Sequence, residues 1–151
     1  MARHNSQRQA ASNRRVRESD YLALAEFRYQ VRRFLRFSEG NARKAGLHPQ
    51  QHRLLLAIKG MPSGLMANIG NLAEKLQIQH HSAVELIDRT VASGLVARRS
   101  HPGDRRVVTV HITPRGERLL HKLSWQNREE LRSAAPALVK TLRALTTEQN
   151  T

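Results

Sequence analysis

The stretch NIGNLAEKLQIQHHSAVELIDRTVASGLVARRSHPGDRRVVTVHI, residues 68–112, decides the fold. Its first part predicts a helix that Asn68 caps, because apolar residues recur there at helical spacing. That helix buries Ile69, Leu72, Ala73 and Leu76. After a break at residues 77–79, a second helix ends at Gly94 and buries Ala83, Leu86, Ile87, Thr90 and Val91. Two short helices joined by so tight a turn are typical of a helix-turn-helix.

Two β-prone segments complete the stretch, at residues 95–99 and 107–112. The second alternates Val108, Val110 and Ile112 with polar residues, which is the pattern of a strand with one buried face. Between the two segments lie Pro102 and Gly103, residues that favour turns. The sequence therefore predicts a β-hairpin with arginines at its tip, and hence a winged helix-turn-helix.

Amphipathic helices flank this region. Apolar residues recur at helical spacing over residues 20–44, where Gly46 ends the helix. Pro49 then begins a helix that ends before Gly60.

After the hairpin, Thr113 and Pro114 begin a long helix that runs to about residue 133. Pro136 is expected to break it, because proline in a helix interior removes a hydrogen bond. A last helix is marked by Leu138, Val139, Leu142 and Leu145.

The predicted fold class is mainly α with a small β-hairpin wing, a winged helix-turn-helix flanked by long N- and C-terminal dimerisation helices. The apolar stripes of the flanking helices extend past what one small domain can cover, so we expect them to pair with a second copy. A symmetric dimer places two recognition helices roughly 34–36 Å apart, which implies a pseudo-palindromic DNA target. The expected parts are a disordered basic arm (1–19), N-terminal helices (20–60), the DNA-binding region (61–112), C-terminal dimerisation helices (113–145) and a tail (146–151).

Charge and composition limit the function classes. The chain of 151 residues has 26 Lys and Arg against 12 Asp and Glu, a formal net charge of +14, which favours double-stranded DNA as the partner. It has no cysteine, which excludes disulfides and thiolate metal sites. No apolar run approaches the ~20 residues of a membrane span, and the basic N-terminus lacks the apolar segment of a secretory signal. We therefore expect a cytoplasmic protein with no membrane partner.

The chain resembles the multiple-antibiotic-resistance regulator (MarR) family over residues 21–145. The resemblance rests on Leu72-Ala73-Glu74-Lys75-Leu76, His80-His81-Ser82-Ala83-Val84, Ile87-Asp88-Arg89, Ser93-Gly94-Leu95-Val96, Asp104-Arg105-Arg106 and Ile112-Thr113-Pro114-Arg115-Gly116. It implies a homodimeric, ligand-responsive transcription factor, usually a repressor. It also implies an effector pocket between the first, second and long post-wing helices, lined by Tyr29, Arg32, His52 and Trp125. A cationic lining there favours a small anionic aromatic effector.

The candidate DNA contacts lie on the second helix and the wing. On the helix they are Gln79, His80, His81, Ser82, Glu85 and Arg89, at the end where such helices meet base edges or off the buried face. Arg98 and Arg99 are expected to contact phosphates. One of Arg105 and Arg106 is expected to enter the minor groove, while the other pairs with Asp104, which positions the wing.

Two residues depart from the family pattern. Gln77 stands at a turn where the family often has glycine, so it must adopt the left-handed conformation or reshape the turn. Glu85 is repelled by phosphates unless it accepts a hydrogen bond from cytosine or pairs with Arg89.

Other readings are weaker. No paired carboxylates, phosphate-binding loop or activated nucleophile suggests an enzyme, and we expect no cofactor and no metal site. His48 and His52, four residues apart, are spaced as metal ligands, but a helix cap and a partly buried interface residue are the favoured interpretation. A sequence-tolerant architectural DNA-binding protein and an RNA-binding winged helix remain the alternative functions.

Overall fold

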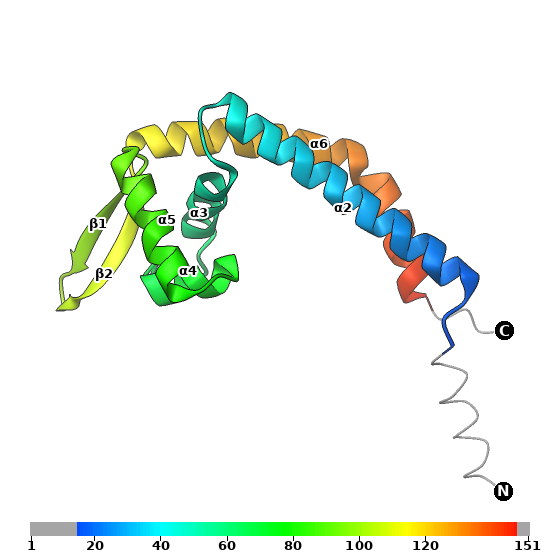
Figure 1. Ribbon diagram of the computed structural model, residues 1–151, viewed down its shortest axis with the longest axis horizontal. Helices are drawn as coiled ribbons and strands as arrows, with labels where there is room; N and C mark the ends of the chain where they lie inside the picture. The colour runs from blue at the N-terminus through cyan, green and yellow to red at the C-terminus, as the bar shows by residue number, and fades with distance from the viewer. Residues whose placement is uncertain (1–14, 148–151) are drawn as a thin grey trace, which may run out of the picture. The chain divides into compact units, whose positions relative to one another are not determined.

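The computed structural model describes residues 15–147 (Figure 1). They fall into two compact units: residues 36–129 form the larger, and the residues up to Leu35 together with those from Glu130 onward form the smaller. The elements are α2 (Glu18–Lys44), α3 (Pro49–Lys59), α4 (Ile69–Leu76), α5 (His80–Ala92), β1 (Val96–His101), β2 (Asp104–Ile112) and α6 (Pro114–Thr146). The expected fold class, mainly helical with a two-stranded hairpin, is confirmed.

A single apolar cluster holds the larger unit together. Its largest fully buried side chains come from α3, α4, α5, the residue before the hairpin, β2 and α6: Leu54, Leu55, Leu72, Ile87, Leu95, Val110 and Leu123. The predicted faces of α4 and α5 supply this cluster, with Ile69 and Val91 half-buried at its edge. Periodicity thus identified the packing faces of both helices correctly.

The turn between α4 and α5 is built around Gln77. Its backbone is left-handed (φ 54°, ψ 47°), the first of the two outcomes expected for a residue other than glycine there. The side chain offsets part of the strain, because its Nε2 donates a hydrogen bond to the Glu74 carbonyl at 2.8 Å. The turn therefore keeps the geometry of a glycine turn without a glycine.

The hairpin is antiparallel and is held on its outer side by the segment before α4. Arg98 pairs with Val110 and Arg99 with Thr109 across the ladder, with an irregularity at Ser100/His101 near the tip. The N–H of Val110 donates to the carbonyl of Ala67 at 2.9 Å, beside a bridge between Asn68 and Thr109. The wing is therefore fixed along both edges of β2.

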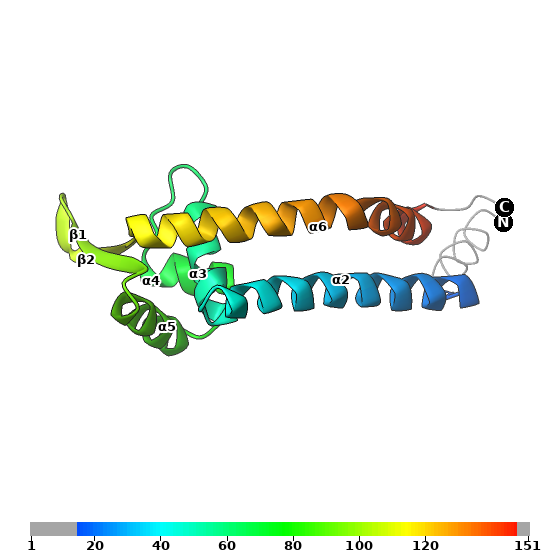
Figure 2. The same ribbon diagram turned by 90° about the horizontal axis from the view of Figure 1, so that it is seen from above.

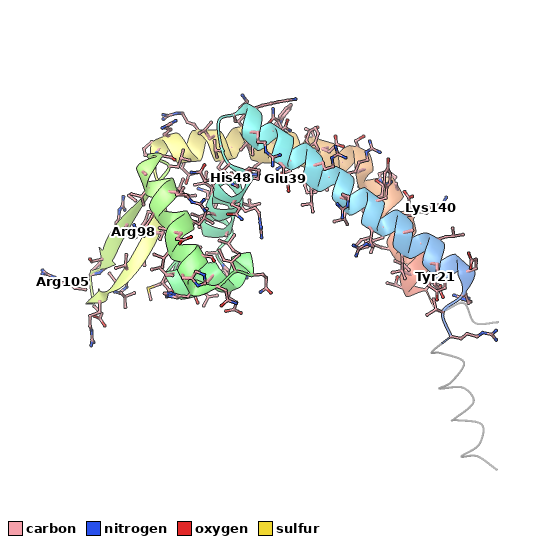
Figure 3. All side chains as sticks on the ribbon, in the orientation of Figure 1. Tyr21, Glu39, His48, Arg98, Arg105 and Lys140 are labelled. Carbon is pink, nitrogen blue, oxygen red and sulfur yellow. The ribbon has the colours of Figure 1, made fainter. Side chains whose placement is uncertain are left out.

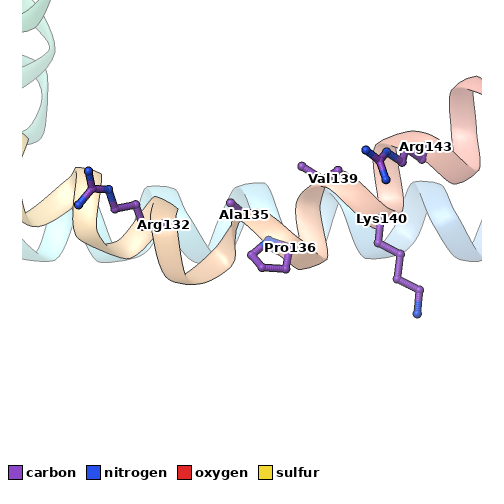
Figure 4. A pocket seen from close by; sticks show the side chains of 6 residues that line it. All are labelled: Arg132, Ala135, Pro136, Val139, Lys140 and Arg143. Atoms are coloured by element: carbon purple, nitrogen blue, oxygen red, sulfur yellow. The ribbon is translucent and has the colours of Figure 1, made fainter.

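Helix α6 runs without interruption through Pro136, so the predicted break there is wrong. Proline costs a helix about 3 kcal/mol but does not end it when the flanking turns are stable. Figure 4 shows Pro136 among the α6 side chains around a shallow hollow, which is lined by Arg132, Ala135, Pro136, Val139, Lys140 and Arg143.

The smaller unit consists of the first part of α2 and the last part of α6, which run antiparallel side by side (Figures 1 and 2). Its apolar side chains are largely exposed, and they include Tyr21, Leu22, Leu24, Tyr29, Leu131, Val139 and Leu142. Among the described residues of this unit, Thr141 is the one that is buried. Two helices with so much exposed apolar surface lack a core of their own.

The expected boundaries shift slightly at both ends. Glu18 and Ser19, placed in the arm by the sequence, already belong to α2, and Thr146 belongs to α6 rather than to the tail. The rest of the expected arm, residues 1–14, and residues 148–151 of the tail lie outside the described residues. None of the described helices is both long enough and apolar enough to cross a bilayer.

Candidate nucleic-acid interface

Helix α5 presents a polar face opposite its buried one. Ala83, Leu86, Ile87 and Thr90 are buried, which fixes the rotation of the helix about its axis. Five of the six predicted contact residues are exposed and Ser82 is half-buried; the exposed ones are Gln79, His80, His81, Glu85 and Arg89. The side chain of Gln79, at the N-cap, makes no capping hydrogen bond. Its amide thus remains available for a ligand at this end of the helix.

Glu85 and Arg89 form no ion pair within residues 15–147. The Glu85–Arg89 ion pair, one of the two explanations suggested for Glu85, is therefore absent from the described part of the protein without DNA. Its carboxylate remains free to accept a hydrogen bond from a cytosine amino group, the other account given for it.

Arg98 joins the hairpin to helix α5. Its guanidinium donates to the Asp88 carboxylate, and the arginine side chain is two-thirds buried. Arg98 was expected to contact phosphate, but this bond commits one face of its guanidinium to the protein. Asp88 was missed by sequence reasoning, because nothing local indicates that a carboxylate on α5 meets an arginine ten residues further on.

Asp104 organises the wing tip. It accepts hydrogen bonds from the backbone N–H of Arg106 at 3.0 Å and from that residue's Nε and Nη2 at 3.2 and 3.3 Å. These hydrogen bonds lower the pKa of the Asp104 carboxyl, and those from the Arg106 side chain have the larger effect. The structure thus identifies Arg106 as the wing arginine that pairs with Asp104.

Both wing arginines remain accessible. Arg106 is 91% exposed in its side chain despite the pair, and Arg105 projects from the tip of the hairpin (Figure 3). His101 stabilises the turn beside them, since its Nδ1 accepts a hydrogen bond from the N–H of Gly103 at 3.1 Å. At the tip, Arg106 is therefore oriented by Asp104, whereas Arg105 is not.

The base of the wing is tied to the start of α6. Thr113 Oγ1 donates to the Gly94 carbonyl at 2.7 Å and accepts from the N–H of Gly116 at 3.2 Å, while Arg115 donates to the Ser93 carbonyl at 2.8 Å. Gly116 packs so tightly that a Cβ there would lie 2.2 Å from the carbonyl oxygen of Leu95. The hairpin, the end of α5 and the start of α6 are therefore one rigid piece.

Part of this rigid piece lies in a segment that matches a known family. The model of the MarR family matches residues 45–107, from the loop before α3 to the second strand of the wing. Residues 45–107 are therefore similar to the MarR family. The resemblance inferred from the motifs is confirmed over these residues.

A relative in sequence covers the same region. The uncharacterized HTH-type transcriptional regulator YsmB of Bacillus subtilis (strain 168) is 39% identical over 64 residues. That match spans 42% of this chain and 44% of YsmB, less than half of either protein.

Solved MarR-family structures share the fold over more of the chain. AbsC from Streptomyces coelicolor has a TM-score of 0.68 at 19% identity, over 88% of this chain and 93% of AbsC. A mutant of Escherichia coli MarR, solved in complex with operator DNA, has a TM-score of 0.61 at 20% identity, over 78% of this chain and 86% of that one. At these identities the likeness shows the fold.

The two histidines before and within α3 have structural roles. His48 caps α3. Its Nδ1 accepts a hydrogen bond from the N–H of Gln50 at 3.3 Å, and Oε1 of Gln51 accepts one from the N–H of His48 at 3.0 Å. His52 is 5% exposed, and burial lowers its pKa. Within residues 15–147 no three His, Cys, Asp or Glu residues gather as a metal site. The cap interpretation of His48 is confirmed.

The four residues expected around an effector fall in different units. Tyr29 and Arg32 are exposed on α2 in the smaller unit. In the larger unit His52 is buried, with no hydrogen-bond partner for Nε2 among the described residues, and Trp125 is 57% exposed.

Proposed function

We propose that the protein is a transcriptional regulator that binds double-stranded DNA site-specifically as a homodimer. The observation that carries this proposal is the rigid joining of the exposed face of α5 to a cationic wing tip, through Asp88–Arg98 and the wing base. A helix in the major groove and an arginine in the adjacent minor groove need such a fixed relation. The E. coli MarR mutant solved with operator DNA has this fold, which supports the assignment.

This proposal gives each predicted site residue a role in binding DNA or in positioning the wing. Gln79, His80, His81, Ser82 and Glu85 contact base edges, Arg89 contacts a phosphate or a base, and Arg99 contacts a phosphate. Arg106 enters the minor groove while it is held by Asp104, so one arginine takes both of the roles that the sequence divided between two, and Arg105 contacts the neighbouring backbone. Arg98 acts chiefly through Asp88, by setting the angle between the wing and the recognition helix.

The homodimer rests on the smaller unit. Its exposed apolar side chains, among them Leu22, Leu24 and Leu142, have no described cover, and a second copy provides a matching surface under two-fold symmetry. The division into DNA-binding residues 61–112 and dimerisation residues 20–60 and 113–145 is part of this proposal. So are the pseudo-palindromic operator, repression as the sign of regulation, and a cytoplasmic location.

The test is selection of bound duplexes from a random pool, followed by titration of the winner against scrambled DNA at fixed salt. We expect an inverted repeat that binds about 10³-fold or more tightly than scrambled DNA. No enriched motif, with binding that collapses as salt rises, would replace this proposal by the architectural one. Tighter binding to an RNA hairpin of the same length would favour the RNA-binding alternative.

Response to a small anionic aromatic effector at Tyr29, Arg32, His52 and Trp125 stays a prediction. Its check is a thermal-shift screen with aromatic carboxylates, in which a bound ligand raises the melting temperature. No stabilisation by any of them would remove the effector from the model.

A further inference from the structure

A cavity of about 540 Å³ lies in the larger unit between the wing and the segment that connects α3 to α4. Arg98 points to α5, so the next residue, Arg99, projects from the opposite face of the hairpin. Arg99 and its cross-strand partner Thr109 both line the cavity. The cavity thus lies on the face of the wing turned away from the recognition helix.

The walls of the cavity are mainly apolar and are not filled by the protein. Ile58 and Met61 line it from the end of α3 and the turn after it, and Leu65 and Met66 line it from the connecting segment. Leu65 is 51% and Met66 40% exposed, so apolar surface there remains in contact with solvent. A volume of this size lies within the range of pockets for small organic ligands, and methionine side chains adapt to irregular shapes.

The polar part of the lining is cationic or neutral. It contains Arg99 and His111 but no aspartate or glutamate. Within residues 15–147 Arg99 forms no ion pair with a carboxylate. His111 is oriented by a hydrogen-bonding contact of 2.8 Å between its Nε2 and Thr109 Oγ1. An apolar wall with an unpaired guanidinium at its edge is complementary to an apolar molecule that carries one negative charge.

We propose that this cavity binds a small organic carboxylate with an apolar body, whose charge is bound by Arg99. The apolar body replaces water against Leu65, Met66 and Ile58, and the carboxylate accepts two hydrogen bonds from the guanidinium fork. The site is distinct from the one expected around Tyr29 and His52, because each of its walls belongs to the wing or to residues 58–67.

The test is isothermal titration of the full chain, without DNA, with 2-naphthoate and decanoate as probes and 2-naphthylmethanol as the uncharged analogue. We expect one of the two carboxylates to bind and the alcohol to bind at least about ten-fold more weakly, because charge-assisted hydrogen bonds are the strong ones. Arg99→Gln should weaken carboxylate binding about ten-fold and leave the alcohol unchanged. Leu65→Asp should weaken carboxylate binding through like-charge repulsion.

The matched control is Arg118→Gln, which removes an equal charge from an exposed position on α6 outside the cavity lining. It should leave carboxylate binding unchanged, and circular dichroism should show all three variants folded. The proposal is overturned if neither carboxylate binds the wild type. It is equally overturned if binding survives both Arg99→Gln and Leu65→Asp, since the ligand then lies elsewhere. Neither result bears on DNA binding, so failure here is distinguishable from failure of the proposed regulator.

Discussion

At the scale of single residues, the wing shows how one carboxylate makes two neighbouring arginines different. Asp104 orients the Arg106 guanidinium with two hydrogen bonds and accepts a third from the Arg106 backbone N–H, whereas Arg105 has no such partner in the described structure. A side chain that is already oriented loses less conformational entropy on binding than a free one. We therefore propose Arg106 as the minor-groove contact.

We accordingly predict that Arg106→Ala weakens DNA binding about ten-fold or more, for every sequence, and lowers the slope of log affinity against log salt by about one. Arg105→Ala should weaken binding less. Fluorescence anisotropy with a labelled operator over a series of salt concentrations measures both quantities. A larger effect from Arg105→Ala would exchange the two roles, and no effect from either would remove the wing from the interface.

A second residue-scale prediction concerns His52 and pH. Burial lowers the pKa of His52 in the folded protein, while the unfolded chain keeps the ordinary value near 6.5. Below that pH the unfolded chain binds a proton that the folded protein does not, so the free energy of unfolding falls as pH decreases. The fall begins near pH 6.5 and stops once the pH is below the folded pKa.

Urea unfolding at several values between pH 5 and pH 8 measures this dependence. His52→Leu should reduce the fall between pH 7 and pH 5, because leucine is of similar size and Nε2 has no described partner to lose. An unchanged pH profile in the variant would show that another group causes the dependence. The low pKa of Asp104 acts in a separate window, since its carboxylate is protonated only below about pH 4.

At the scale of elements, capping residues and glycines located most helix boundaries to within about two residues, and the exception is Pro136. Asn68 and Thr113 cap their helices as predicted, because a capping side chain satisfies backbone groups within three residues of itself. Pro136 was expected to end a helix, but it remains inside α6. A proline penalty is finite, and a helix can continue through it when the turns on both sides are stabilised.

Pro136→Ala is therefore predicted to stabilise the protein. It restores one backbone hydrogen bond of α6 and removes a steric conflict, and we expect the free energy of unfolding to rise by about 2 kcal/mol after allowance for the more flexible unfolded chain. Chemical denaturation of the two proteins at equal concentration measures the change. Destabilisation instead would show that the proline ring contributes packing that α6 requires.

At the scale of the whole molecule, the proposed DNA contacts and the proposed dimer surface lie in different units. The side chains proposed to contact DNA lie in the larger unit, whereas the smaller unit exposes Leu22 and Leu24 on α2. We predict that Leu24→Glu shifts the protein from dimer to monomer, because a carboxylate in an apolar interface carries a large desolvation cost. Light scattering after size exclusion gives the mass directly.

The variant should also lose much of its preference for an inverted repeat over a single half-site, since one recognition helix then binds alone. The matched control is Leu56→Glu, which changes a similarly exposed leucine on α3 in the larger unit. A Leu24→Glu protein that keeps the mass of the wild type would place the dimer interface elsewhere.

The sequence by itself determined the elements as far as the wing, the buried faces of α4 and α5, the basic wing tip and the family resemblance, because periodicity, capping and turn residues act over a few positions. Only the tertiary structure decided that Arg98 bonds to Asp88, that Arg106 rather than Arg105 pairs with Asp104, and that His52 is buried. It also decided that Arg99 borders a cavity with residues 58–67. Side chains distant in the sequence meet only after the core has packed, and no local pattern encodes which rotamer or partner results.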